Sequence, residues 1–186
     1  MSRERQIIEA AIAVFARYGF RRTTMADIAS ESGISRQALY ARFTSKHAIM
    51  TAAIAWFTEE KLARLETEWC RLDRLADKLD AYFRLIVVPY FEQLRAMPDF
   101  GDLLTGVSEE SRAAKERAVN DKKARIASLF TPYGRQLGTS GSSPDALAEL
   151  VVTSAEGFVF TARDRAHLDT LLSNLRQAAL TLCASG

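Results

Sequence analysis

The 186-residue chain has few of the residues that perform most protein chemistry: two cysteines, two histidines and four prolines. Cys70 and Cys183 lie far apart and lack the paired spacing of metal or redox motifs, so we expect ordinary thiols and no metal. His47 and His167 are also well separated. No motif joins a histidine, a carboxylate and a nucleophile, and no glycine-rich phosphate loop is present. These absences argue against an enzyme, so we expect no catalytic residues and no cofactor.

Long apolar runs are missing as well. None reaches the roughly 18 residues that a membrane-spanning helix needs, and the opening MSRERQ lacks a signal-peptide pattern. We therefore expect a cytoplasmic protein with no membrane partner. Strand-like alternation is absent, whereas helical periodicity recurs along the chain, so the predicted fold class is all-α. With 48% hydrophobic residues the chain can bury a substantial core.

Positive charge is concentrated near the start of the chain. Residues 1–47 hold eight Lys/Arg against four Asp/Glu, a local balance of +4, whereas residues 48–186 hold seventeen against nineteen, a balance of −2. A local basic excess is typical of a part that meets nucleic acid. We therefore predict a DNA-binding domain at residues 1–47 and a second helical domain at residues 48–186.

Residues 24–46 have the pattern of two short helices joined by a tight turn. Thr24 is a predicted N-cap, and Asp27 lies at the third helical position, where its carboxylate can return a hydrogen bond to the cap. Gly33 falls where the chain must turn sharply, a place that often requires positive φ. The pattern predicts a helix-turn-helix.

The second of these helices has one apolar and one polar face. Ser35 is its predicted cap, and Leu39 and Phe43 are predicted to face the core. The opposite face carries Arg36, Gln37, Tyr40 and Arg42. Arginine can bond to guanine and glutamine to adenine, while tyrosine hydroxyls usually meet phosphate. Any helical hairpin has caps and a solvated face, however, so this pattern alone leaves a plain surface helix open.

The preceding segment completes a three-helix unit. In RQIIEAAIAVFARYGFRRTT, Ile8, Ile12 and Phe15 form one helical stripe, and Gly19 ends the helix. TTMADIA, SGIS and LYARFTSKHAI follow in order and without a gap. The whole of residues 3–57 resembles the N-terminal DNA-binding domain of the TetR family of transcriptional regulators.

The resemblance implies roles for individual positions. It places four side chains on backbone phosphates, namely Thr24, Ser35, Tyr40 and Lys46. It places three at base edges, namely Arg36, Gln37 and Ala38. Two positions depart from the family pattern. His47 stands where Glu is frequent and is interpreted as a surface residue at a helix start, while Gln37 replaces a small residue and is expected to alter operator preference.

The second domain is predicted to begin with a helix that Thr44 or Ser45 caps and that both domains share, so that it can transmit motion between them. The most apolar stretch follows, and Pro89 interrupts its helical pattern. A kink there can open an apolar ligand pocket. The candidate lining residues are Tyr82, Phe83, Ile86, Val87, Tyr90, Phe91, Leu94, Phe100, Leu103 and Leu104. Plain core packing explains the same residues.

Two helices, at residues 145–163 and 167–183, are predicted to end the chain after a flexible connection, YGRQLGTSGSS. The first carries small residues near its middle, and the second repeats leucine or alanine with the spacing of a helix seam. The family resemblance implies that this pair forms a dimer interface. The candidate residues are Ser154, Gly157, Phe158, Leu168, Leu172, Leu175, Ala179 and Leu182. An intramolecular bundle explains the seam equally well.

Glu156 lies in the apolar stretch VVTSAEGFVF. A buried carboxylate there needs a partner, such as an arginine or a polar group of a ligand. An exposed helix position is the alternative and the favoured interpretation.

Three functions fit the sequence. The first is a TetR-type repressor that binds a palindromic operator in double-stranded DNA as a homodimer and is released by a small apolar or aromatic effector. The second keeps the DNA binding but docks a protein partner on the C-terminal domain. The third is an enzyme or small-molecule carrier, which the lack of catalytic motifs disfavours.

Overall fold

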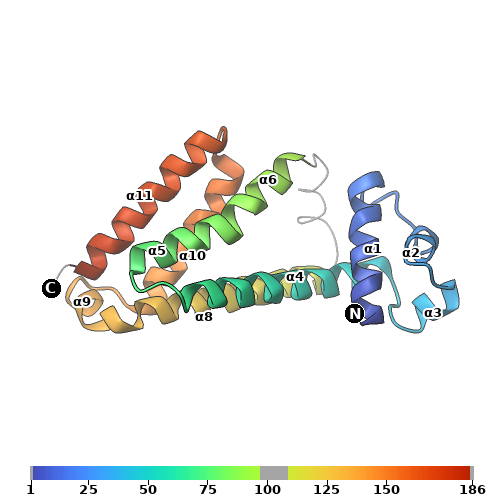
Figure 1. Ribbon diagram of the computed structural model, residues 1–186, viewed down its shortest axis with the longest axis horizontal. Helices are drawn as coiled ribbons and strands as arrows, with labels where there is room; N and C mark the ends of the chain where they lie inside the picture. The colour runs from blue at the N-terminus through green and yellow to red at the C-terminus, as the bar shows by residue number, and fades with distance from the viewer. Residues whose placement is uncertain (1, 97–108, 185–186) are drawn as a thin grey trace. The chain divides into compact units, whose positions relative to one another are not determined.

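The computed structural model describes residues 2–96 and 109–184, and these are helices joined by short turns, with no β-strand among them (Figure 1). The predicted all-α fold class is confirmed. The chain divides into two compact units, one made of residues 1–59 and 93–118 and the other of residues 60–92 and 119–186. We call them the N-terminal and the C-terminal unit.

The N-terminal unit is built on α1 (Arg3–Tyr18), α2 (Met25–Glu31), α3 (Arg36–Tyr40) and the first part of α4 (Lys46–Trp69). Their apolar side chains share one core, formed by Ile7, Ile8, Ala11, Phe15, Phe20, Ile28, Ala29, Leu39, Phe43, Ile49, Met50 and Ala53. The last three belong to α4. The unit therefore extends past the expected boundary at residue 47, because the start of α4 completes its core.

Local signals define α1 at both ends. The Ser2 side chain caps the helix by accepting a hydrogen bond from the Arg5 N–H, and Gly19 ends it with φ of 78°. The predicted stop at Gly19 is confirmed, since glycine adopts positive φ without steric strain. The Arg5 guanidinium lies 4.7 Å from the centre of the Trp56 ring, a cation–π contact that joins α1 to α4.

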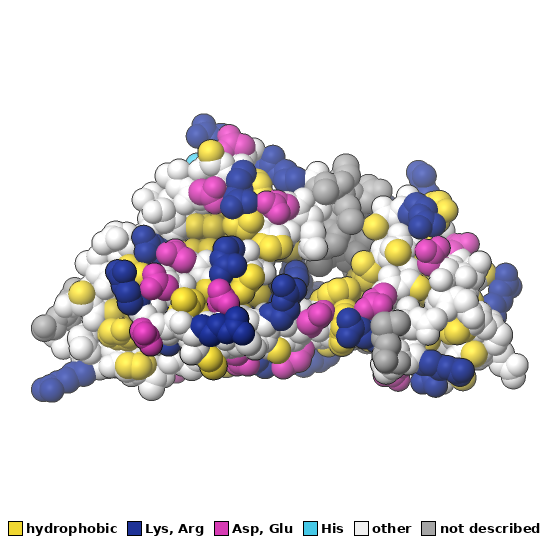
Figure 2. Space-filling view, in the orientation of Figure 1, with side chains coloured by type: hydrophobic (Ala, Val, Ile, Leu, Met, Phe, Trp, Pro, Cys, Tyr) yellow, Lys and Arg dark blue, Asp and Glu magenta, His cyan; other side chains and the backbone are white. Residues whose placement is uncertain are grey.

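The C-terminal unit contains the rest of α4, α5 (Leu75–Tyr82), a π-helix η1 (Phe83–Val87) that continues into α6 (Val88–Ala96), and the second part of α8 (Glu109–Phe130). A 3-10 turn (Thr131–Tyr133) and α9 (Gly134–Thr139) lead to α10 (Pro144–Thr161) and α11 (Arg165–Ala184). α11 packs on α5, α9 and α10, and α10 also contacts η1. On the face in Figure 2, charges of both signs alternate over these helices, with apolar side chains between them.

The prediction of a flexible connection after Pro132 was wrong. This segment folds into α9, whose Leu137 is fully buried, so a single apolar anchor orders a stretch rich in glycine and serine. The chain then turns at Gly141, with φ of 73°. The helix predicted at residues 145–163 begins one residue earlier, because the Ser143 side chain accepts a hydrogen bond from Ala146 N–H and Pro144 fills the first position.

Pro89 distorts its helix, although the form of the distortion differs from a simple kink. The five residues before Val88 form a π-helix, and the Val88 N–H donates to the Phe83 carbonyl. A widened turn thus stands immediately before the proline, which cannot supply the N–H that the Leu85 carbonyl would take in an α-helix.

Candidate nucleic-acid interface

Thr24 and Asp27 hold the start of α2 through a reciprocal capping box. Asp27 N–H donates to Thr24 Oγ1 at 3.2 Å, and Thr24 N–H donates to the Asp27 carboxylate at 2.8 Å. The Thr24 hydroxyl also donates to that carboxylate, at 2.7 Å. These bonds lower the pKa of Asp27, so the cap is intact at neutral pH and weakens as pH falls through that lowered pKa. The predicted capping box is confirmed.

The turn between α2 and α3 is a Schellman motif. Gly33 has φ of 67°, its N–H donates to the Ser30 carbonyl, and Ile34 N–H donates back to the Ala29 carbonyl. The predicted positive φ at Gly33 is confirmed. Gln6 of α1 donates to the Ser32 carbonyl at 2.9 Å, so the first helix also holds the turn in place.

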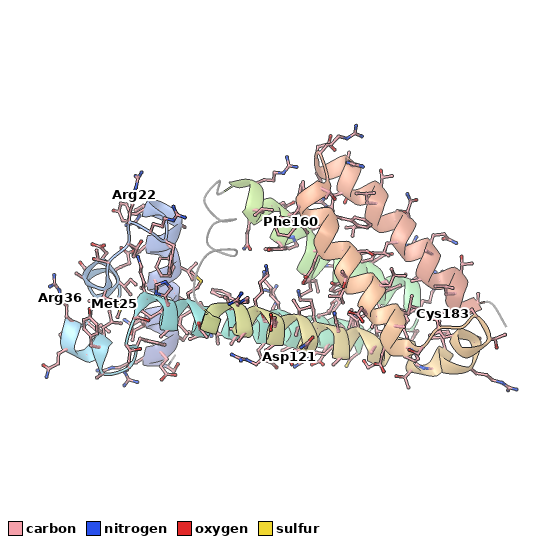
Figure 3. All side chains as sticks on the ribbon, turned by 180° about the vertical axis from the view of Figure 1, so that it is seen from behind. Arg22, Met25, Arg36, Asp121, Phe160 and Cys183 are labelled. Carbon is pink, nitrogen blue, oxygen red and sulfur yellow. The ribbon has the colours of Figure 1, made fainter. Side chains whose placement is uncertain are left out.

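α3 presents the polar face that the sequence predicted. Ser35 caps the helix by accepting from Ala38 N–H at 3.1 Å, and Leu39 and Phe43 are buried in the core. The polar residues Arg36, Gln37, Tyr40 and Arg42 are all exposed, while Ala38 is half-buried. In Figure 3 the Arg36 side chain projects from α3 away from α1. The described structure thus brings together the predicted base-edge residues on one short helix.

The charges of this unit leave its basic side chains available. Two of the acids already have partners, since Glu9 lies 2.8 Å from Arg5 and Glu31 lies 3.3 Å from Arg17. The exposed arginines that form no ion pair within the described residues include Arg21, Arg22, Arg36 and Arg42. Figure 2 shows basic side chains around the edge of the unit. Unpaired guanidinium groups are suited to phosphate oxygens and base edges.

Lys46 has a different place from the one that the family resemblance implied. Its ammonium donates to three backbone carbonyls, those of Phe20 at 2.8 Å, Arg21 at 3.0 Å and Thr23 at 2.9 Å. A lysine has three N–H donors, so none is left for a phosphate. The group also lies 4.8 Å from the Phe20 ring centre, and burial lowers its pKa. Lys46 thus ties the start of α4 to the chain before α2.

His47 and the cap of α4 are as the sequence indicated. Ser45 caps the helix, with Ala48 N–H donating to its side chain at 3.1 Å. His47 is half-buried, and its ring packs edge-on against Phe20 with 5.1 Å between centres.

The predicted pocket residues divide into three groups. Five are buried, namely Tyr82, Phe83, Ile86, Val87 and Phe91. Tyr90 and Leu94 are half-buried. Phe100, Leu103 and Leu104 lie outside the described residues. Burial of the first group fits core packing, the alternative that the sequence left open.

A polar cluster that the sequence did not predict lies in the C-terminal unit. Glu156 is paired with Lys122 of α8, so its favoured interpretation as an exposed residue was wrong. Burial, and then the Glu156 carboxylate, raise the pKa of Tyr82 above its usual range and the pKa of Tyr90 to about 12. Lys61 of α4 and Lys122 interact electrostatically. No spacing in the sequence signalled this cluster, because its members come from five different helices.

Most of the α11 residues predicted to form the dimer interface are buried by contacts within the protomer. Leu168, Leu172, Leu175 and Ala179 are buried against the rest of the C-terminal unit, which fits the intramolecular bundle that the sequence left open. Ser154, Phe158 and Leu182 are half-buried, and Gly157 is exposed. The 4-3 spacing marked the face that α11 packs inward.

Neither a metal site nor a membrane span is found in the described part of the chain. No group of three or more His, Cys, Asp or Glu there is arranged to hold a metal ion. No described helix combines the length and apolar character needed to cross a membrane.

Known proteins share the features of this unit. Residues 7–53 match the family model described as bacterial regulatory proteins, tetR family. The HTH-type transcriptional regulator YuxN of Bacillus subtilis is 25% identical over 140 residues, which cover 72% of this chain and 47% of YuxN. YfiR, another HTH-type regulator of that organism, is 35% identical over 83 residues, 41% of this chain and 40% of YfiR. The matched part thus spans less than half the length of either relative.

The fold of the whole chain also has a solved counterpart. The transcriptional regulator FadR from Bacillus subtilis, in complex with stearoyl-CoA, superposes with a TM-score of 0.65 at 16% identity, covering 94% of this chain and 96% of FadR. The helix-turn-helix geometry, the family match over residues 7–53 and this shared all-α fold agree. Residues 7–53 thus form a domain of the tetR family of bacterial regulatory proteins.

Proposed function

We propose that the protein is a transcriptional repressor that binds a palindromic operator as a homodimer and is released by a small effector. The observation that carries the DNA-binding part is the exposed polar face of α3, where Arg36 and Arg42 form no ion pair within the described structure. Arg36, Gln37 and Ala38 then meet base edges in the major groove, and Tyr40 meets a phosphate. Thr24 and Ser35 lie at helix N-termini, where backbone N–H groups favour phosphate.

The surface we propose for the second subunit lies on α10. Among the described residues, the large exposed apolar side chains of the C-terminal unit are Leu150, 48% exposed, and Phe160, 52% exposed. Thr153 and Gly157 lie between them on the same helical face and are also exposed. A Cβ added to Gly157 would meet no atom within 4 Å, so packing inside the protomer does not require glycine there. Close approach of a helix from the second subunit would explain the glycine at position 157, which packing within the protomer does not.

The exposed face of α11 extends this surface. From Thr170 onward its exposed side chains are uncharged and include Thr170, Ser173, Asn174, Gln177, Ala178 and Thr181. Subunit interfaces are depleted in charge at their centre. The proposed interface therefore uses α10 and the polar face of α11, whereas the leucine seam holds the protomer together.

An effector in the C-terminal unit would act through α4. This continuous helix contributes to the core of the N-terminal unit and also belongs to the C-terminal unit. A ligand that prefers one arrangement of α4 lowers DNA affinity by its difference in affinity for the two arrangements. The complex of FadR with stearoyl-CoA supports the proposal that this fold can hold an effector.

Docking of a protein partner receives less support. Exposed aromatic side chains around residues 90–104 would favour that alternative, and residues 97–104 lie outside the described residues. Phe91 is buried, and Tyr90 packs edge-on against Phe160 with 6.1 Å between ring centres. Figure 3 places Phe160 on α10.

Selection from a random duplex library, at a stated salt concentration, tests the DNA-binding proposal directly. We expect a palindromic consensus whose half-sites lie about one helical turn, ~34 Å, or a comparable distance apart. Recovery of a non-palindromic consensus would contradict the dimer. Recovery of no consensus from folded protein would contradict sequence-specific binding altogether.

A charge on the α10 face should break the dimer. We expect Leu150→Glu to produce a monomer at micromolar concentration, because desolvating a carboxylate against a second apolar helix is unfavourable. The masses from light scattering and from sedimentation measure this. Ala63→Glu, an equally exposed helix position on α4, is the matched control and should stay dimeric. A dimeric Leu150→Glu protein would place the interface elsewhere.

A further inference from the structure

Lys61 holds a positive charge in a partly buried place without a counter-ion. Its side chain, on α4, is half-buried and forms no ion pair or hydrogen bond within the described residues. Burial is the main reason that its pKa is lowered, followed by the positive charges of Lys122 and Arg64, while Glu60 opposes them. An ammonium group in such surroundings favours the arrival of an anion.

Lys122 carries a second ammonium group within electrostatic range of the first. It donates to the Glu156 carboxylate, and both side chains are largely shielded from solvent. Glu156 therefore neutralises one of the two lysines. Lys61, Lys122 and Glu156 together retain one positive charge in this partly buried region of the C-terminal unit.

Tyr82 adds an unsatisfied hydrogen-bond donor. Its side chain is 0% exposed, and its hydroxyl has no hydrogen-bond partner in the described structure. Glu156 lies within electrostatic range, and burial together with that charge keeps the hydroxyl protonated at neutral pH. Leaving a buried hydroxyl unpaired is unfavourable, so such a group calls for a partner that the protomer does not supply.

Apolar side chains and an irregular helix surround these groups. Tyr82 directly precedes the π-helix at Phe83–Val87, and α10 contributes the buried Val152 and Val159 around Glu156. Widened helical turns are frequent at functional sites, because their backbone bonds can rearrange to regular ones. The same region thus has an apolar environment, excess positive charge and a free donor.

We propose that this cluster of Lys61, Lys122, Glu156 and Tyr82 binds an organic carboxylate with an apolar body. The carboxylate pairs with Lys61 and Lys122, the apolar body lies among the side chains of η1 and α10, and the Tyr82 hydroxyl donates to an acceptor on the ligand. This inference rests on the proposed effector function and names the chemical class of the effector.

A matched panel of small molecules tests the charge requirement. The probes are octanoate, benzoate and 4-hydroxybenzoate, compared with octanol and benzyl alcohol and with octylamine and benzylamine. We expect at least one carboxylate to raise the Tm of the full chain by about 3 to 6 °C at ten times its Kd, with no such rise from its alcohol or amine counterpart. Failure of all three carboxylates, or equal binding of the uncharged counterparts, overturns the proposal.

Variants test the residues themselves. Lys61→Met should weaken binding of the tightest-binding carboxylate about 30-fold or more. It should also raise the Tm of the free protein, because an uncompensated charge is removed. Tyr82→Phe should also raise the Tm of the free protein and should weaken binding of the same carboxylate about fivefold. Arg74→Met, which removes an exposed cation at the N-cap of α5, is the control and should change affinity by less than about threefold. Stabilisation without loss of probe affinity in both variants contradicts the assigned roles.

Operator release separates this inference from the proposed function. If a carboxylate binds through Lys61 but leaves operator affinity unchanged, the result supports the carboxylate site and contradicts its role in releasing the operator. If an alcohol or amine releases the operator and no carboxylate does, the result supports the effector-controlled repressor and contradicts the carboxylate site.

Discussion

Lys46→Met is expected to lower the free energy of unfolding by about 2 kcal/mol and to weaken binding to every DNA sequence. The substitution keeps the aliphatic stem and removes the three N–H groups that hold the carbonyls of Phe20, Arg21 and Thr23. Those carbonyls precede Thr24, so the start of α2 loses its anchor. Chemical denaturation measures the first effect, and fluorescence anisotropy with labelled duplexes measures the second.

Two further measurements separate anchoring from direct phosphate contact. Loss of a phosphate contact reduces the slope of log affinity against log salt by about 0.9, whereas loss of an anchor leaves that slope nearly unchanged. Lys46→Arg keeps the charge but cannot direct three donors at one point in the same way. We therefore expect Lys46→Arg to be destabilising as well. An arginine variant with full stability and full DNA affinity would favour the phosphate role.

Arg36→Ala is expected to relax the preference for one base pair in each half-site. A bidentate arginine–guanine contact contributes about 1 to 3 kcal/mol of discrimination, and a two-fold dimer loses it twice. Stability should hardly change, because Arg36 is exposed and forms no ion pair within the described residues. Competition between the selected operator and single-base variants of it measures the preference.

Two comparisons make this result interpretable. Tyr40→Phe, which removes an exposed hydroxyl from the same helix, should weaken binding to all DNA sequences by the same factor. Arg135→Ala, an exposed arginine on α9, should leave DNA binding unchanged. If Arg36→Ala alters neither affinity nor preference, the assignment of α3 as the recognition helix is wrong.

The sequence predicted the N-terminal unit well because its determinants are short-range. The capping box of Thr24 and Asp27, the positive φ at Gly33 and the end of α1 at Gly19 each depend on bonds within a few residues. The inward face of α3, with Leu39, follows from helical periodicity alone. The exposed residues opposite it were therefore predictable too.

The local sequence pattern predicted the structure less well where a single residue decides the conformation of the whole segment. A stretch rich in glycine and serine predicted a flexible connection, yet burial of Leu137 orders it as α9. Pro89 predicted a distortion, and the structure relieves the missing N–H through a π-helix rather than a sharp bend. In both cases the sequence located the irregularity and tertiary packing selected its form.

The sequence by itself determined the all-α class, the caps and turn of the helix-turn-helix, and which face of each helix is apolar, because these depend on neighbours three or four residues away. Tertiary structure alone decided the rest. Lys46 bonds to carbonyls at least 23 residues earlier in the chain. The leucine seam of α11 meets α5, α9 and α10. Glu156 pairs with a lysine 34 residues away. Spacing along a chain shows that a side chain is directed inward, but only the packed fold determines which partner it meets there.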